Sequence, residues 1–560
     1  MSRKSMLSLL LAAIMLLSLL SGCGETAAEP TQAPATQAPA TQAPSTPDEP
    51  DTPDEPVSMY PLVEGDPMEI TAFFTVGNFV TMHLPDEDFN NIAAIKAANE
   101  ACNVWMDVIM YDATFYKEQL YIMLAGGEYP DLLHQPEKYY TGGIEALINE
   151  EICIDLVPYM EEYMPDYYNN VYNADDIYAK KITSDEGHVV TIWGRVGAIK
   201  AGSVIRQDWL DDLNLEVPTT FDELHDVLMA FKTEKGADQA IMRTNGIIGS
   251  YTDSNFVGGY DNLVTSSNNS DIPWVIGDDG KVVCSYMKPS FQGYIQMLAD
   301  WYQDGLYSDD SFSLDGNPTT WFNYIHNNRT GYWVAATSTL TSSFAANVVD
   351  PNFKAAAMAD VTLNEGDSID VGNSRGILGD GGWAITTQCE QVENVCKYMN
   401  WFFTEEGHHI SNYGVEGEAH YVDADGKIQY NDVILHNENG ASTMATTAIY
   451  CNFFQNPFDR TVWSLAATLD ESARSCFDTW TANRTEDKVY QGVLTPEETE
   501  LYNSKVGDIA TYASEKLSAL CHGDMDVAEF WPEFTAQLES MGIAELTAAK
   551  QAAYDRYMAR

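Results

Sequence analysis

Residues 69–76 read EITAFFTV, a run of β-branched and aromatic residues that stops at Gly77-Asn78. The segments that follow alternate in type, with helical spacing at 90–101 and 115–125 and strand-like runs at 104–110 and 130–133. Strand–helix–strand order at this spacing predicts a parallel sheet covered by helices. In such sheets, ligands bind beside the carboxyl ends of the strands.

The first 22 residues have the order of an export signal. Arg3 and Lys4 precede an uncharged, mostly apolar run from Ser5 to Gly22. Basic, apolar and small residues in this order are typical of a secretory signal peptide, although a retained membrane helix of about 20 apolar residues is the alternative. Leu-Ser-Gly-Cys at 20–23 resembles the lipobox of bacterial lipoproteins, which implies cleavage before Cys23 and lipidation of that cysteine. We therefore expect an extracytoplasmic protein that is lipid-anchored to the cell membrane.

A spacer follows the anchor. Residues 31–45 read TQAPA, TQAPA, TQAPS, and two shorter TPDEP segments continue to Pro56. Short repeats rich in proline cannot form a core and favour extended chain. We interpret residues 23–59 as the lipidated cysteine and a solvated stalk.

The composition limits the class of protein. The chain has 560 residues and a formal net charge of −55, with 45 % hydrophobic and 11 % aromatic residues. That much apolar material excludes global disorder, and the length predicts two or more compact units. The negative charge excludes nucleic acid and an anionic lipid surface as partners of the folded part. Eight further cysteines are scattered without metal-binding spacing, which favours buried thiols over disulfides.

Six motifs in register carry a resemblance to a known family. The first two are YIMLAGGEYPDLL (121–133) and VIRQDWLDDLNLEVPTTFDELHDVLMAFK (204–232). Four more lie at 155–167, 297–310, 401–427 and 530–557. Together they resemble the bacterial extracellular solute-binding proteins of family 1, which are substrate-binding lipoproteins of ABC importers, and in particular the larger oligosaccharide-binding branch. The resemblance covers essentially all of residues 60–560.

The resemblance implies an α/β, two-lobed periplasmic-binding-protein-like fold of type II, with a hinge between the lobes and a C-terminal helical region. We place the first lobe at about 60–197 and 375–445, and the second at 198–374 and 446–560.

Most of the motif residues have a structural interpretation. Thr220 followed by Glu223 predicts a capping box at a helix start, and Trp209 is expected in the core. Larger members of the branch often carry a calcium loop after Ala-Phe-Lys, but TEKGADQAIM at 233–242 lacks its alternating oxygen ligands. We therefore expect no calcium there and no other metal or cofactor.

A sugar site needs aromatic platforms and polar side chains that bond to hydroxyl groups. The resemblance places Thr75 and Asn78 at the cleft after the first strand, and His134, Gln135 and Glu137 after the third. The candidate aromatic residues and the candidate cation, each with a core or ion-pair role as its alternative, are Trp193, Tyr251, Trp333, Trp383 and Arg375. Arg206 is a weaker candidate for the same cationic role.

The expected function is capture of a sugar or oligosaccharide between the lobes and its delivery to the membrane permease of an ABC importer, with domain closure and no catalytic residue. We expect a monomer that prefers neutral glycans, because its surface is strongly negative. A secreted glycoside hydrolase, which needs two carboxyl groups about 5–10 Å apart, is one alternative. A ligand-sensing subunit of a membrane receptor is another, because it shares the fold.

Overall fold

The computed structural model describes residues 58–76, 83–84, 86, 88–174, 176–195, 201–242, 254–264, 271–313, 318–371, 378–437, 441, 443–451, 461–469, 473–484, 488, 490 and 492–560. They belong to one unit that begins at Ser58. The predicted signal peptide and lipidated Cys23 lie outside these residues. None of the described helices is long and apolar enough to cross a membrane.

The first sheet has five strands in the order β2-β1-β3-β11-β4. Its members are β1 (Met68–Val76), β2 (Val104–Asp112), β3 (Leu132–His134), β4 (Thr191–Arg195) and β11 (Leu378–Ile385). β1 runs parallel to β2 and β3, whereas β11 runs antiparallel to β3 and β4. The three predicted N-terminal strands are confirmed, and so are the helices between them, α3 (Ala93–Cys102) and α4 (Ala113–Gly126).

The inner strands of this sheet are buried on both faces, as expected for strands flanked by crossover helices, whereas the edge strand β2 exposes Trp105 and Ile109. Phe74 of β1 belongs to a core that includes residues of α3, α7 (Val157–Tyr163) and α17 (Val392–Trp401). Its neighbour Phe73 points to the opposite face, where it packs with Tyr116 of α4 and Leu147 of α6 (Gly143–Asn149). The alternation of side chains along one strand therefore fills two separate cores.

The second sheet has four strands in the order β10-β5-β9-β6. They are β5 (Ala201–Arg206), β6 (Ile241–Met242), β9 (Tyr332–Ala336) and β10 (Ala355–Ala357). On one face α11 (Phe221–Lys235) contributes Leu224 and Leu228 to the largest core. The predicted capping box is present at its start, with Thr220 accepting a hydrogen bond from the Glu223 amide at 3.2 Å.

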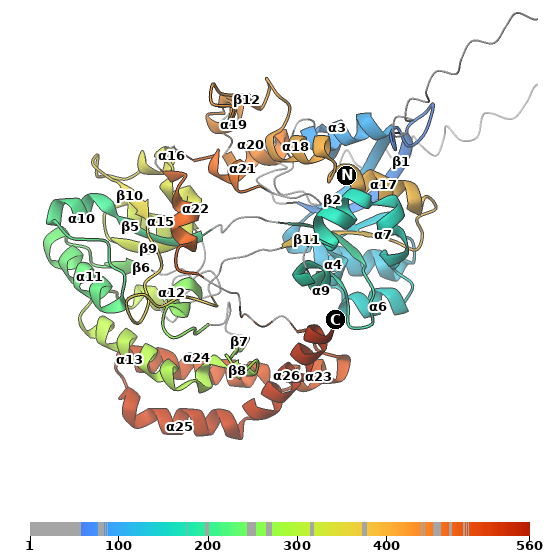
Figure 1. The fold of residues 1–560 in the computed structure, drawn as a ribbon. Helices are drawn as coiled ribbons and strands as arrows, with labels where there is room; N and C mark the ends of the chain where they lie inside the picture. Colours follow the sequence, from blue (N-terminus) through green and yellow to red (C-terminus); the bar gives the residue numbers. More distant parts are fainter. Residues whose placement is uncertain are drawn as a thin grey trace, which may run out of the picture. The chain divides into compact units, whose positions relative to one another are not determined.

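Four long helices pack together beside this sheet, as Figure 1 shows for α13, α24 and α25. They are α13 (Pro289–Gln303), α24 (Val506–His522), α25 (Val527–Ser540) and α26 (Ile543–Ala559). At the end of the chain, Arg556 and Arg560 both donate hydrogen bonds to the Asp185 carboxylate, at 2.9 and 2.6 Å. Asp185 follows α9 (Asp176–Ile182), so the last helix packs back on the body.

The remaining elements connect and cover these layers. They are η2 (Phe89–Asn91), α5 (Pro136–Tyr139), α8 (Pro165–Tyr167), η3 (Tyr168–Tyr172), α10 (Gln207–Leu213), α12 (Ser254–Gly258), β7 (Trp274–Ile276), β8 (Val282–Cys284), η5 (Ser285–Met287), α14 (Asp310–Ser313), α15 (Pro318–His326), η6 (Thr337–Leu340), α16 (Ser342–Ala345), α18 (Glu405–Tyr413), β12 (His420–Val422), β13 (Ile428–Tyr430), α19 (Asp432–Leu435), α20 (Thr443–Tyr450), α21 (Val462–Ala466), α22 (Cys476–Thr481) and α23 (Pro496–Asn503).

The eight cysteines after Cys23 are all described, and each is buried and outside any disulfide. Burial raises the pKa of Cys102, Cys396 and Cys476 to about 12. These thiols stay protonated at neutral pH and act as small apolar core groups.

Candidate functional site

The carboxyl ends of the parallel strands meet at one edge of the first sheet. Thr75 lies at the end of β1 and His134 at the end of β3, one residue beyond the Phe73–Leu133 pair. β11 enters this edge from the opposite direction, so that Trp383 lies opposite His134. Trp193 of β4 pairs in turn with Gly382. Four predicted site residues, distant in sequence, therefore share the edge where an α/β sheet binds its ligands.

An aromatic cluster lies behind this edge. The Phe74 ring lies 4.3 Å from the His134 ring and 5.1 Å from Trp383, which it stacks against at an interplanar angle of 14°. Phe89 meets the Trp383 indole edge-on at 6.4 Å. Trp383 is only 1 % exposed, so in this conformation its faces contact protein side chains.

Several buried polar atoms at the edge have no hydrogen-bond partner among the described residues. They are Thr75 Oγ1, both ring nitrogens of His134, both carboxylate oxygens of Glu137, and Thr191 Oγ1. A buried polar group without a partner costs about 1–3 kcal/mol, and such groups in native proteins are normally paired with protein, water or ligand. Their concentration here marks an edge whose polar groups are available to a bound molecule.

Burial also sets the protonation of two of these groups. It raises the pKa of Glu137 to about 7, against the smaller opposing effects of its own backbone amide, the Thr191 hydroxyl and Lys138. The amide and the hydroxyl are therefore close neighbours of the carboxylate, although neither meets it with hydrogen-bond geometry. Burial lowers the pKa of His134 to about 3, and the charge of Lys138 adds to this effect. The His134 ring is therefore neutral at physiological pH, whereas Glu137 titrates close to neutrality.

The turn from β3 into α5 holds these residues in place. Gln135 has a φ of 55°, an uncommon left-handed conformation for a residue other than glycine, and it begins α5. Its backbone N–H donates to the carbonyl of Gly382 at 2.8 Å, and the Tyr116 hydroxyl donates to the carbonyl of His134. A strained turn residue that a neighbouring strand and helix hold in place is often found at a functional site.

Two more of the predicted tryptophans differ in exposure, and three predicted residues lie outside the described chain. Trp193 is half-buried beside the same core, with its backbone N–H bonded to the Tyr167 hydroxyl at 3.3 Å. Trp333 is completely buried in the second sheet, where its indole N–H donates to Thr339 at 3.2 Å. Asn78, Tyr251 and Arg375 lie outside the described residues.

Arg206 is committed to interactions within the protein. It is fully buried and bonded to the carboxylates of Asp208 and Asp350 at 2.6 and 3.1 Å. Its guanidinium also lies 4.1 Å from the ring centre of Trp209. These contacts assign it to the core rather than to a ligand.

Two residues of the edge have no sequence signal of their own. Tyr116 lies in an ordinary amphipathic helix, and Thr191 is one polar residue in the TIWGR strand. Only the pairing of β4 and β11 brings Thr191 to this sheet. Their position could be inferred from sequence only after the strand order was known.

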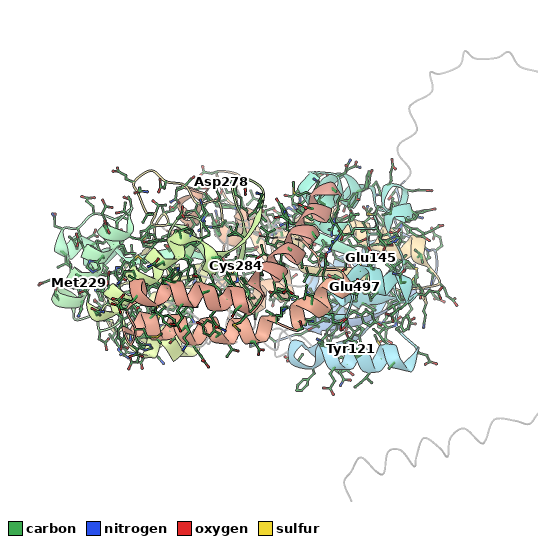
Figure 2. The ribbon with its side chains drawn as sticks, turned by 90° about the horizontal axis from the view of Figure 1, so that it is seen from below. Tyr121, Glu145, Met229, Asp278, Cys284 and Glu497 are labelled. Carbon is green, nitrogen blue, oxygen red and sulfur yellow. The ribbon has the colours of Figure 1, made fainter. Side chains whose placement is uncertain are left out.

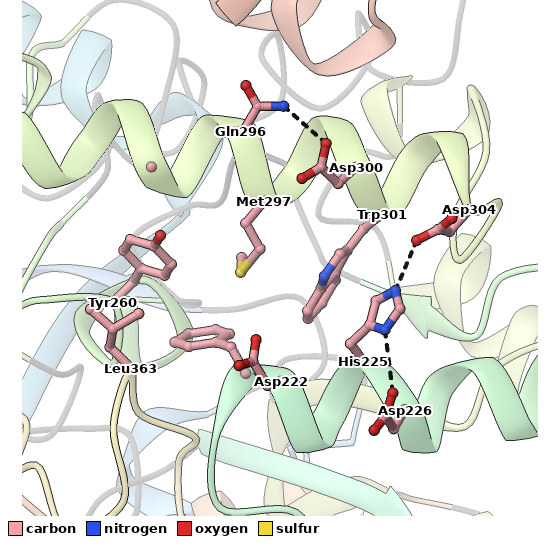
Figure 3. Close-up of a pocket in the computed structure, with 12 residues that line it drawn as sticks. Asp222, His225, Asp226, Tyr260, Gln296, Met297, Asp300, Trp301, Asp304 and Leu363 are labelled. Carbon is pink, nitrogen blue, oxygen red and sulfur yellow. Dashed lines mark hydrogen bonds and ion pairs between the residues drawn. The ribbon is translucent and has the colours of Figure 1, made fainter. Parts of the chain in front are cut away.

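A separate groove lies between α11 and α13. It encloses about 630 Å³ and is lined by Phe221, Asp222, His225, Asp226, Tyr260, Gly293, Gln296, Met297, Asp300, Trp301, Asp304 and Leu363. Figure 3 shows aromatic side chains between the two helices and four aspartates around them. His225 bonds to Asp304 at 2.9 Å. None of the predicted site residues within the described part of the chain lines this groove.

The two covered open sheets define the predicted two-lobed solute-binding protein fold. The solved structure of the alginate-binding protein AlgQ2 without calcium ion has this fold, with a TM-score of 0.65, 22 % identity, and 88 % of this chain and 98 % of that chain covered. FusA of Streptococcus pneumoniae in complex with kestose gives a TM-score of 0.64 at 17 % identity, with 88 % and 99 % covered.

Curated relatives confirm the predicted resemblance to sugar-binding lipoproteins of ABC importers. Lipoprotein LipO of Bacillus subtilis is 28 % identical over 28 % of this chain and 29 % of its own length. The polygalacturonan/rhamnogalacturonan-binding protein YtcQ of the same species is 30 % identical over 26 % and 28 %. The fructooligosaccharide ABC transporter substrate-binding protein FusA is 23 % identical over 42 % and 45 %. The matches thus span less than half of each relative, and no family model matches the chain.

Proposed function

We propose that this chain is the solute-binding component of an ABC importer. In this proposal the lipid on Cys23 holds the protein at the outer face of the cell membrane. The lobes capture a sugar or oligosaccharide at the carboxyl edge of the first sheet and deliver it to the membrane permease. Closure of the lobes excludes water and completes the hydrogen bonds to the sugar.

The observation that carries the proposal is the set of buried polar groups without partners at this edge. Thr75, Glu137 and Thr191 offer hydroxyl and carboxyl groups on the face of the sheet that carries Phe73. The rings of His134 and Trp383, 5.4 Å apart, lie at the same edge on the opposite face, which carries Phe74. Sugar hydroxyls both donate and accept hydrogen bonds, so they can satisfy groups of either kind. Trp383 offers an apolar surface that sugar CH groups could pack against only if Phe74, Phe89 or His134, which cover it in this conformation, move aside.

Neutral glycans remain the preferred ligand class in this proposal. Glu137 is uncharged or negative, and Arg206, one of the two cationic candidates, is already paired with Asp208 and Asp350. A polyanionic glycan would meet an uncompensated acid. Because YtcQ is named for polygalacturonan and AlgQ2 for alginate, uronic acid oligomers belong in any ligand screen.

Binding is favoured over hydrolysis by the names of the relatives, two of which describe binding proteins and none an enzyme. A glycoside hydrolase would need, besides its catalytic acid, a second carboxyl group about 5–10 Å away. A ligand-sensing receptor subunit uses the same fold and the same edge, so it differs in its membrane partner and not in its ligand.

A thermal-shift screen of the full-length chain tests the sugar assignment. The panel contains neutral fructo-, gluco- and manno-oligosaccharides, uronic acid oligomers, a peptide mixture and chromogenic glycosides. We expect a rise in melting temperature with at least one neutral oligosaccharide and no release of chromophore. Stabilisation by peptides alone would contradict the sugar assignment, and turnover of a glycoside would favour the hydrolase.

A further inference from the structure

A second group of titratable side chains lies on α6 and on the turn that joins α9 to β4. Glu145, Glu186 and His188 each offer one ligand atom to this group, and these atoms all lie within 4.8 Å of one another. Glu145 is labelled in Figure 2, close in that view to Glu497 of α23. None of the three residues belongs to the carboxyl edge described above.

The imidazole of His188 is oriented by a carboxylate. Its Nδ1 lies 3.0 Å from Oδ2 of Asp155. The other oxygen of Asp155 accepts hydrogen bonds from the backbone N–H groups of Val157 and Val189, each at 3.1 Å. Because a carboxylate accepts, Nδ1 carries the proton, so Nε2 is the nitrogen that can bind an ion when the ring is neutral. The hydrogen bond to Asp155 also raises the pKa of His188, so a metal ion would compete with a proton for this nitrogen. This carboxylate–histidine pairing is the arrangement that surrounds metal-bound histidines.

Glu145 is held in a similar way. Its Oε1 accepts a hydrogen bond from the backbone N–H of Glu186 at 3.3 Å. Its Oε2 is shielded from solvent and has no hydrogen-bond partner among the described residues. An ionised oxygen that is both buried and unpaired is costly, and a cation relieves that cost.

We propose that Glu145, Glu186 and His188 form a zinc site. One imidazole nitrogen and two carboxylate oxygens are a ligand set that Zn²⁺ accepts, with water as the fourth ligand. Glu186 is exposed, which gives the ion a path from solvent. The bound ion joins α6 to the turn that carries Asp185, the residue to which Arg556 and Arg560 bond. Zinc binding therefore stabilises the attachment of the last helix.

Calorimetric titration of the full-length, metal-free chain with ZnCl₂ tests this site. We expect one zinc ion per chain at micromolar affinity. His188→Ala removes the nitrogen ligand and abolishes this binding, whereas Asp155→Asn, which disturbs only the orienting carboxylate, weakens it about 10- to 100-fold. His436→Ala is the matched control, because His436 also pairs with a carboxylate at 3.0 Å but lies on an exposed helix turn. It leaves zinc binding unchanged.

The competing interpretation is that His188 is a protonated partner of the carboxylates, without a metal. In that case the wild-type chain binds no zinc stoichiometrically, which overturns the proposal. Equal binding by the wild type and His188→Ala overturns it as well, since the zinc then lies elsewhere. Circular dichroism in EDTA checks that each variant is folded. Glu145→Gln keeps the side-chain volume and its backbone hydrogen bond, and should also lose zinc if the site is correct.

Discussion

Glu137 lies on α5 with both carboxylate oxygens shielded from water, and burial raises its pKa to about 7. In the unfolded chain the same group titrates near its ordinary value of 4.5. Between these two pH values the folded state holds a proton that the unfolded state has lost. The free energy of unfolding therefore falls as the pH rises through this range, and stays low above it.

We predict that Glu137→Gln removes this decline. The full effect of the pKa shift is about 3 kcal/mol, because one unit is worth about 1.4 kcal/mol. Urea denaturation of the wild type and Glu137→Gln at pH 5 and pH 8 measures the difference. The variant should equal the wild type at pH 5 and exceed it at pH 8. Parallel curves for the two proteins would contradict the assignment of a buried, neutral acid.

For individual residues, position and surroundings could be predicted from sequence only in part. Thr75 ends a predicted strand, and His134, Gln135 and Glu137 follow another, so their position at the carboxyl edge of the sheet could be anticipated. The environments of Trp333 and Trp383 could not, because both indoles are buried in different sheets. Local sequence does not reveal which layer a tryptophan fills when its contacts come from distant segments, as Phe89 and Phe353 do here.

Among the elements, α11 begins where the sequence predicts it to begin. Its capping box uses two residues three positions apart, so it needs no distant contact. We predict that Thr220→Ala lowers the free energy of unfolding by about 1 kcal/mol, because the side-chain acceptor for the Glu223 amide is lost. Chemical denaturation measures the loss. A change below about 0.3 kcal/mol would mean that water replaces the cap at no cost.

The last helix, α26, depends on distant contacts that sequence spacing does not reveal. Arg556 and Arg560 converge on Asp185, more than 370 positions away along the chain. We predict that Asp185→Asn speeds hydrogen exchange in α26 by about 3- to 10-fold, because charge-assisted bonds are roughly twice as strong as neutral ones. Mass spectrometry of peptides from 543–559 measures the rate.

The matched control for this prediction is Asp432→Asn. Asp432 also pairs with a basic side chain, His436, but it is 89 % exposed and lies on another element. It should leave exchange in α26 unchanged. If both variants behave alike, the arginine contacts do not hold the helix in place.

For the whole molecule, the order of the motifs was enough to predict the fold class, because strand–helix–strand spacing and six family motifs in register point to the same architecture. The insertion of β11 between β3 and β4 could not be derived in this way. It joins residues nearly 250 positions apart and completes the ligand edge. The lobe boundaries remain predictions, as does the membrane anchor at Cys23.

The net charge of −55 determines how ligand affinity should depend on salt concentration. A neutral glycan has no net Coulomb interaction with the protein, so its affinity should change less than about 2-fold between 20 and 500 mM salt. Calorimetry at the two salt concentrations measures this. A steep gain in affinity at high salt would indicate a polyanionic ligand instead, because salt screens its repulsion from the acidic surface.

In the proposed function, a saccharide binds the polar groups at the carboxyl edge of the first sheet. These groups have no hydrogen-bond partner among the described residues. Thr75→Val tests this proposal most directly, because the hydroxyl has no hydrogen bond to lose in the unliganded protein. Trp105→Ala is the control, since Trp105 lies near the amino end of β2 and is 51 % exposed.

The measurement is a calorimetric titration of the best glycan from the screen into the wild type, Thr75→Val and Trp105→Ala. Loss of one hydrogen bond of about 1–1.5 kcal/mol weakens binding about 5- to 12-fold. We predict this loss in Thr75→Val, with the melting temperature unchanged or higher and with Trp105→Ala equal to the wild type. Equal affinity of all three proteins would contradict the claim.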